Sequence, residues 1–152
     1  VREPKNIIAP IGTPINELIE FAGGLREPAG KVLLGGPMMG TAIYDMSYPV
    51  TKTTNGITVL KREPEREMLP CIRCGSCVAH CPMGLTPTAI NTSMEIGDPA
   101  ERAAALASLS VGLCIECGCC SYVCPSSRPL VQTNRLAKAY LREYSSRTAG
   151  LK

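Results

Sequence analysis

Eight of the nine cysteines fall into two motifs with the same Cys-x2-Cys-x2-Cys-x3-Cys-Pro spacing, which begin at Cys71 and Cys114. Three thiolates two residues apart, on a loop that wraps a cluster, can each reach a different iron of one [4Fe–4S] cube. The fourth thiolate precedes a proline that turns the chain away, so it points at the other cube where two cubes are present. The pattern therefore predicts two [4Fe–4S] clusters with crossed ligands.

The crossed pattern assigns four cysteines to each cluster. The first cluster takes Cys71, Cys74, Cys77 and Cys124, and the second takes Cys81, Cys114, Cys117 and Cys120. Gly75 and Gly118 follow the second cysteine of each motif and allow the backbone to approach the inorganic core. Structural zinc is the alternative, but its four ligands usually form two separated pairs, which does not explain a third cysteine followed by Cys-Pro. No catalytic residue is predicted.

The ninth cysteine, Cys119, immediately precedes Cys120, so two ligand registers are conceivable in the second motif. The first motif has Ser76 at the equivalent position, where serine is no iron ligand. We therefore interpret Cys119 as a small side chain beside the cluster, with a substitute ligand or a redox-sensitive thiol as the alternatives. The chain has one histidine, His80, and a Rieske centre needs two, so we expect it at the surface.

Composition limits the classes of function. The 152 residues are 45% hydrophobic and 19% charged, which excludes wholesale disorder. No apolar run approaches the roughly 18 residues that a membrane span needs. The repeated cysteine motifs indicate a reducing compartment, and the small net charge of +3 does not predict nucleic-acid binding. The chain begins at Val1 without a signal peptide, so we expect a fragment of a longer polypeptide.

The distribution of cysteines and charges predicts an α+β chain with two domains. Residues 1–62 contain no cysteine and are predicted to form a small β-grasp unit. Residues 63–70 mix charges with proline and are predicted to form a linker. Residues 71–147 contain all nine cysteines and are predicted to form an α-helical ferredoxin-type domain with two clusters.

The first domain is predicted to contain one helix and two or three strands. Thr13 predicts the N-cap of the helix, Pro14 its first residue and Gly23-Gly24 its end. Strands are predicted at residues 31–34, 49–53 and 57–60, with the last two joined by a hairpin turn at Asn55-Gly56.

Three helices are predicted in the second domain. One begins after Thr86-Pro87 and ends near Gly97, and another begins at Asp98 with a capping box. A third opens at Pro129 and runs towards Tyr144. Its basic side chains predict either a solvated face or a docking surface for an acidic electron donor or an anionic surface. They are Arg135, Lys138 and Arg142.

Apolar side chains that adjoin the ligands are predicted to keep water away from the cluster sulfurs. They are Ile72, Val78, Leu85, Ile115, Val123 and Leu130. Such a shell would help to set the reduction potential of each cluster.

Motifs in both halves of the chain resemble known families. Cys71-Ile-Arg-Cys-Gly, Cys114-Ile-Glu-Cys-Gly-Cys-Cys-Ser-Tyr-Val-Cys-Pro and Arg128-Pro-Leu-Val-Gln132 resemble the ferredoxin domain of the C subunit of the Rnf electron transport complex. Ala9-Pro-Ile-Gly-Thr-Pro14, Gly35-Gly-Pro-Met-Met-Gly40 and Val50-Thr-Lys-Thr-Thr-Asn-Gly56 resemble the SLBB (soluble-ligand-binding β-grasp) domain that precedes it. The propanediol-utilisation cobalamin reductase is similar in architecture and is the alternative.

The resemblance implies electron transfer through two [4Fe–4S] clusters in an ion-translocating ferredoxin:NAD⁺ oxidoreductase. It implies a peripheral position on the cytoplasmic side of a bacterial or archaeal membrane. The implied partners are the other membrane subunits of the Rnf complex and an electron-donor or electron-acceptor protein such as ferredoxin, with no nucleic acid. A docking module with structural clusters is the rival of a different class.

The resemblance places the FMN- and NADH-binding domain of the family upstream of the SLBB unit. This chain has no Gly-x-Gly-x-x-Gly fingerprint after a strand, and we interpret Gly35-Gly-Pro-Met-Met-Gly40 as a tight turn and not as a phosphate loop. FMN and NAD(H) are therefore expected only in the missing upstream domain. Whether the chain by itself is an enzyme stays open.

Overall fold

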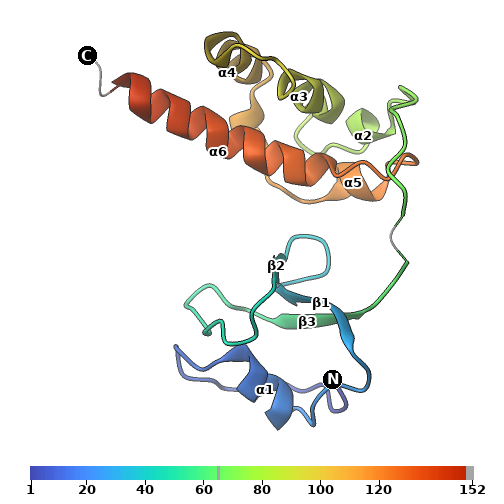
Figure 1. Cartoon of the computed structure of the whole chain (residues 1–152), viewed down its shortest axis with the longest axis vertical. Helices are drawn as coiled ribbons and strands as arrows, with labels where there is room; N and C mark the ends of the chain where they lie inside the picture. The colour runs from blue at the N-terminus through green and yellow to red at the C-terminus, as the bar shows by residue number, and fades with distance from the viewer. Residues whose placement is uncertain (65, 150–152) are drawn as a thin grey trace. The chain divides into compact units, whose positions relative to one another are not determined.

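The computed structural model describes residues 1–64 and 66–149. The chain divides into two compact units, Val1–Glu65 and Arg66–Lys152, which Figure 1 shows as a mixed α/β part and a helical part. The predicted linker at residues 63–70 includes Glu65, which lies outside the described residues. All nine cysteines belong to the second unit.

The first unit combines a short helix with a three-stranded antiparallel sheet. Its elements are α1 (Ile15–Phe21), β1 (Ala29–Leu34), β2 (Thr41–Ile43) and β3 (Ile57–Lys61). The strand order is β2-β1-β3, so β1 is the central strand. One face of α1 packs against the sheet because Ile15 and Ile19, four residues apart in the helix, share a buried group with Val32 of the central strand. The buried residues of this core are Ile15, Ile19, Val32 and Val50.

The predicted hairpin across Asn55-Gly56 is wrong. β3 pairs with β1, where Val59 lies opposite Val32, and the described residues 49–53 form only an isolated bridge between Pro49 and Pro14. A turn signal reports local geometry and does not identify the strand that offers a free edge. β1 offers two edges and buries Val32, which explains why it takes β3 as well as β2.

The start of α1 and the turn after β1 lie close to their predicted positions. α1 begins at Ile15 with Pro14 as its N-cap, one residue later than predicted, because the Thr13 hydroxyl donates to the carbonyl oxygen of Pro10 (2.9 Å) and caps no helical amide. Residues 35–40 connect β1 to β2 and contain the predicted turn, in which the Gly40 N–H donates to the Gly36 carbonyl oxygen (2.9 Å).

Short helices build the second unit around one long helix. They are α2 (Ser76–Ala79), α3 (Pro87–Ser93), α4 (Pro99–Ser108), the 3₁₀ turn η1 (Val111–Leu113) and α5 (Cys119–Tyr122), and the long helix is α6 (Leu130–Ala149). α6 packs against α3, α4, α5 and η1, and Figure 1 shows it running along one side of the unit. The buried core comprises Leu85, Ile90, Leu106, Val111 and Ala137. The unit thus has a core of its own beside the cysteine loops.

Two of the three predicted helix starts in the second unit are confirmed, α6 begins at Leu130 and so one residue later than predicted, and one predicted end is wrong. Asp98 caps α4, because its Oδ1 accepts the N–H of Glu101 (2.7 Å). Thr86 stands at the N-cap of α3, which ends at Ser93 and not near Gly97. The residues after α3 are held in a turn instead, because the Arg102 side chain donates through Nε to the carbonyl oxygen of Ile96 (2.8 Å).

The two halves of the second unit repeat each other in backbone conformation. Cys71 and Cys114 are 43 positions apart, and at this offset α2 corresponds to α5 and the start of α3 to the start of α6. Three pairs of left-handed residues repeat as well. They are Arg73 and Glu116 (φ 56° and 59°), Gly75 and Gly118 (76° and 83°), and Gly84 and Ser127 (64° and 51°). These positions in one half can therefore be compared with those 43 residues away in the other half.

Candidate iron–sulfur site

The eight motif cysteines line two pockets of the second unit. One pocket is lined by Cys71, Cys74, Cys77 and Cys124, and the other by Cys81, Cys114, Cys117 and Cys120. Each pocket therefore combines three cysteines of one motif with the last cysteine of the other. The structure brings together the two sets that the spacing assigns, while iron ligation by them stays a prediction.

Packing between the two short helices explains how the cysteines cross over. α2 carries Cys77 and α5 carries Cys120, both buried, and the two helices contact each other. Cys124 packs against the same buried group, which α6 completes with Leu130 and Val131. Because each helix is only one turn long, the chain that leaves it reaches the pocket of the other motif.

The donors around the sulfur atoms suit an iron–sulfur cluster. The backbone N–H of Arg73 donates to Cys71 Sγ (3.4 Å), and that of Leu85 donates to Cys81 Sγ (3.3 Å). Hydrogen bonds of this kind stabilise the negative charge of cluster thiolates. Among the described residues, no three His, Cys, Asp or Glu side chains converge closely enough to hold a single metal ion. A four-iron core spaces its thiolates more widely than one zinc ion does, because each thiolate binds a different iron.

The thiols differ in their electrostatic surroundings. The Ser76 hydroxyl and its backbone N–H hold the pKa of the Cys74 thiol below its ordinary value. Burial raises the pKa of the Cys120 thiol to about 11, and a hydrogen bond with Cys117 raises the pKa of Cys119. A thiolate at Cys120 is therefore disfavoured unless a positive charge lies beside it.

The two pockets also differ in exposure. Cys71 and Cys74 of the first set are exposed, whereas every cysteine of the second set is at least partly buried. The first pocket is therefore the one that lies nearer to solvent. Electron exchange with another protein is easier at such a site, because the partner can approach the cluster more closely.

The apolar shell around the cysteines is only partly as predicted. Leu85 and Leu130 are buried and line the pockets, which confirms their prediction. Ile72 and Ile115 are exposed but line the first and the second pocket, which agrees with their prediction. Val78 is exposed on the one-turn helix α2 and lines neither pocket, so the prediction is wrong for it. Val123 is half-buried, and His80 is exposed as expected.

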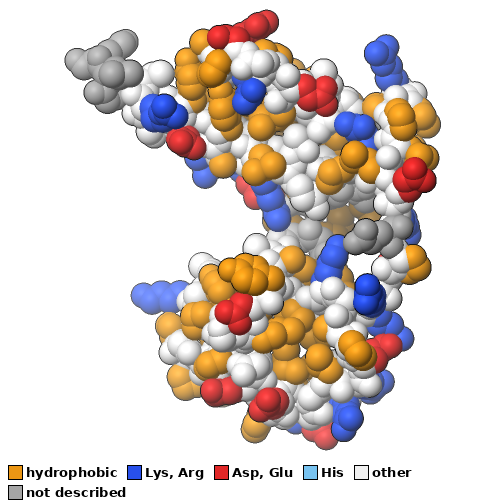
Figure 2. Space-filling view, in the orientation of Figure 1, with side chains coloured by type: hydrophobic (Ala, Val, Ile, Leu, Met, Phe, Trp, Pro, Cys, Tyr) orange, Lys and Arg blue, Asp and Glu red, His pale blue; other side chains and the backbone are white. Residues whose placement is uncertain are grey.

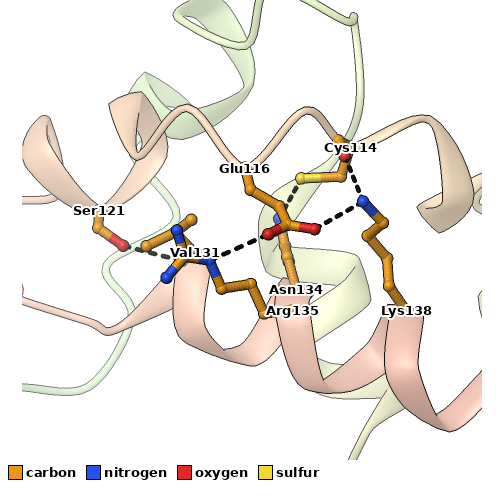
Figure 3. A network of polar contacts seen from close by, with 7 residues as sticks. All are labelled: Cys114, Glu116, Ser121, Val131, Asn134, Arg135 and Lys138. Atoms are coloured by element: carbon orange, nitrogen blue, oxygen red, sulfur yellow. Dashed lines mark hydrogen bonds and ion pairs between the residues drawn. The ribbon is translucent and has the colours of Figure 1, made fainter. Parts of the chain in front are cut away.

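A carboxylate clamp joins the second motif to α6. Glu116 Oε1 lies 2.6 Å from Lys138 Nζ, and Oε2 lies 3.1 Å from Arg135 Nε. Lys138 also donates to the carbonyl oxygen of Cys114 (2.8 Å), as Figure 3 shows. The Lys138 ammonium holds the pKa of Glu116 below its ordinary value, with a smaller contribution from Arg135. The clamp fixes the loop that carries three cysteines of the second set.

This clamp corrects the interpretation of the basic helix face. Arg135 and Lys138 bind a carboxylate of the same chain, and the Lys138 side chain is only 12% exposed, so they form no free docking surface. On the face shown in Figure 2, Lys and Arg side chains of the described residues lie scattered among acidic and apolar ones.

Replacing the clamp carboxylate tests its contribution. Glu116→Gln should lower the free energy of unfolding by about 1–2 kcal/mol, because the amide keeps only one acceptor oxygen and carries no charge, so one of the two charge-assisted hydrogen bonds is lost and the other is weakened. The matched control is Glu143→Gln on α6, whose ion pair with Arg147 is exposed and 4.0 Å long. It should change stability by less than about 0.5 kcal/mol. Thermal unfolding followed by circular dichroism measures both, and equal midpoints would contradict the clamp.

The comparisons with known proteins match both units. A family model described as SLBB domain matches residues 1–42, and one described as 4Fe-4S dicluster domain matches residues 70–128. The C subunit of the ion-translocating oxidoreductase complex of Rhodobacter capsulatus is 47% identical over 151 residues, which cover 97% of this chain and 28% of that protein. The chain is similar to a segment of this C subunit over nearly its whole length. The predicted α+β order, with an SLBB unit before a dicluster ferredoxin-type unit, is confirmed.

Two further relatives show how the C subunit and a different protein share this segment. The C subunit of the Na(+)-translocating ferredoxin:NAD(+) oxidoreductase complex of Acetobacterium woodii is 40% identical over 57% of this chain and 20% of its own length. The cobalamin reductase PduS of Salmonella typhimurium is 31% identical over 99% of this chain and 37% of its own length. The chain therefore spans less than half the length of each of these relatives.

The similarity to the C subunit and the match to the dicluster family confirm the class of cofactor. The second unit is an iron–sulfur domain, as the cysteine motifs predict. No helix within residues 1–64 and 66–149 is long and apolar enough to cross a membrane.

Two residues beside the cysteines, Glu116 and Asn134, were not predicted as part of the site. Asn134 is 1% exposed, its Nδ2 donates to Cys114 Sγ (3.7 Å), and its Oδ1 has no hydrogen-bond partner in the described part of the chain. Such an orphaned oxygen costs about 1–3 kcal/mol. Aligning the two halves at their offset could have drawn attention to Asn134, because it places Asn134 at the position of Asn91.

Proposed function

We propose that this chain carries electrons through two [4Fe–4S] clusters as a segment of the C subunit of the Rnf complex. The observation that carries the proposal is the pair of pockets, each lined by four cysteines that come from both motifs. Two clusters in one small unit favour electron transport, because a path for electrons needs more than one site. Similarity to the C subunit of the ion-translocating oxidoreductase complex supports the same function.

The proposed ligands are the eight cysteines of the two crossed sets. A bound [4Fe–4S] cluster supplies one-electron redox chemistry. The chain holds the thiolates on two loops, directs N–H groups at their sulfurs, and buries Cys77 and Cys120 away from water. The exposed first pocket is the side at which we infer exchange with a partner, such as a ferredoxin or another protein of the complex.

The wider setting of the chain is inferred from its cysteine distribution, from the resemblance of its motifs to the C subunit of the Rnf complex and from the names of its relatives. We infer a domain at residues 1–62, a linker at residues 63–70 and a cluster domain at residues 71–147, in a larger polypeptide whose other part binds FMN and NAD(H). We also infer a peripheral position on the cytoplasmic side of the membrane, beside the other Rnf subunits. The names that support this describe ion-translocating and ferredoxin:NAD(+) oxidoreductase complexes.

Metal content and redox activity test the proposal directly. Anaerobically prepared protein should hold about eight iron and about eight sulfide per chain and show two interacting S = ½ signals after reduction with dithionite. The pure chain should not transfer electrons from NADH to ferricyanide. Stoichiometric zinc, or iron for one cluster only, would contradict the ligand assignment. Two clusters that dithionite does not reduce would favour the docking module with structural clusters.

A cobalamin reductase is the second candidate, because the cobalamin reductase PduS is similar to 99% of this chain. The two candidates share the cluster unit and differ in the proteins around it. Neighbouring reading frames for membrane subunits would support the Rnf complex, and neighbouring genes for microcompartment shell proteins would support the reductase.

A further inference from the structure

Asn134 is one of two buried polar side chains among the described residues, and its surroundings are unusual. The other, Ser126, is satisfied because its hydroxyl donates to the carbonyl oxygen of Pro70 (3.0 Å). Asn134 uses Nδ2 for the sulfur of Cys114, while its Oδ1 stays without a partner in the described residues. An apolar side chain of the same size would avoid an unpaired buried oxygen. The amide is therefore best explained by its effect on the sulfur.

The internal repeat supplies a comparison within the same molecule. Asn91 is the fifth residue of α3, as Asn134 is the fifth of α6, and each lines the cysteine pocket of its own half. Asn91 is engaged elsewhere: its Nδ2 donates to Thr133 Oγ1 (3.1 Å) and its Oδ1 accepts from Arg128 (2.7 Å). The two halves thus differ at equivalent positions, since only the second half directs the amide at a cysteine.

Cys114 is held by α6 through two different atoms. Figure 3 shows Asn134 and Lys138 on neighbouring turns of the helix, with Asn134 at the sulfur and Lys138 at the carbonyl oxygen of the same cysteine. The Asn134 side chain comes from a helix whose buried face is packed, so the amide cannot follow the loop if the loop moves. The N–H donor is therefore preorganised at the sulfur.

We infer that Asn134 is a positioning residue that raises the reduction potential of the cluster held by the second motif relative to the cluster held by the first. The inference rests on the proposed function, because it needs Cys114 to be a cluster ligand. A reduced cluster carries one more negative charge than an oxidised one, so an N–H dipole directed at a ligand sulfur stabilises the reduced state. Asn91 has no equivalent effect because its amide is bonded to Thr133 and Arg128.

The Asn134→Leu variant tests the inference, since leucine keeps the size of the side chain and removes the N–H. EPR-monitored redox titration should show that the second-motif couple becomes about tenfold harder to reduce, which is about 59 mV for one electron. The first-motif couple should not shift. Cys74→Ser and Cys117→Ser assign the two couples, because each changes one ligand of one cluster. Asn91→Leu is the matched control variant and should not change the reduction potential of the second-motif cluster.

Each outcome decides for or against the role of Asn134. Equal shifts of both couples, or no shift in a protein that holds two clusters, would overturn the inference and leave the proposed function standing. A wild-type chain that binds fewer than two clusters would overturn both. If the Asn134→Leu variant does not assemble its clusters, the hydrogen bond from Asn134 to Cys114 is tested in the wild-type protein labelled with ¹⁵N at asparagine. Pulsed EPR of its reduced clusters should show a ¹⁵N coupling that persists in Asn91→Leu, and a missing coupling would refute the role.

Discussion

The Cys81→Ala variant should bind about four iron atoms per chain instead of about eight, and it should lose the cluster of the second motif while it keeps the cluster of its own motif. The reason is the position of Cys81, which lines the pocket of Cys114, Cys117 and Cys120 and not the pocket of its sequence neighbours. Iron analysis and EPR of the reduced protein measure the loss.

The mirror-image variant is the control for this result. Cys124→Ala should remove the first-motif cluster and spare the second, because Cys124 lines the pocket of Cys71, Cys74 and Cys77. Loss of the first-motif cluster from Cys81→Ala would show that the ligands do not cross. Both variants should also lower the thermal midpoint more than Glu116→Gln does, since each cluster joins two distant loops in a small unit.

The spacing of the cysteines predicts the sets that the structure brings together. Cys-Pro at the end of each motif and the repeat offset already imply that the last cysteine leaves its own loop. The helix starts at Asp98 and Thr86 were also predictable, because N-caps depend on residues a few positions apart. These features share one property: short stretches of sequence contain all the groups that determine them.

The features that were missed depend on partners distant in sequence. The choice of β1 as the partner of β3 depends on which edge is free, which no turn signal reports. Glu116 meets Lys138 and Arg135 only after α6 has packed against the second motif. From the sequence alone, Lys138 and Arg135 could not be distinguished from basic side chains on a solvated helix face. The role of Asn134 also depends on a distant partner, Cys114, although its alignment with Asn91 in the repeat could be read from the sequence.

The Cys120→Ser variant should lose or convert the second-motif cluster, whereas Cys119→Ser should keep about eight iron atoms per chain and nearly unchanged EPR spectra. The first ground is position: Cys120 is buried and lines the second pocket, and Cys119 is not among the residues that line it. The second ground is the repeat, which aligns Cys120 with the buried Cys77 and Cys119 with Ser76.

The pair of variants tests the ligand register from within the chain itself. Cys119→Ser recreates at α5 the Ser-Cys pair with which α2 begins, so the first half already shows that serine is accommodated at this position. Adjacent residues on a helical turn point in different directions, so the two thiols cannot readily exchange places at one iron. If Cys119→Ser lost iron and Cys120→Ser kept it, the second motif would use the other register, and the equivalence of the two halves would not extend to their ligands.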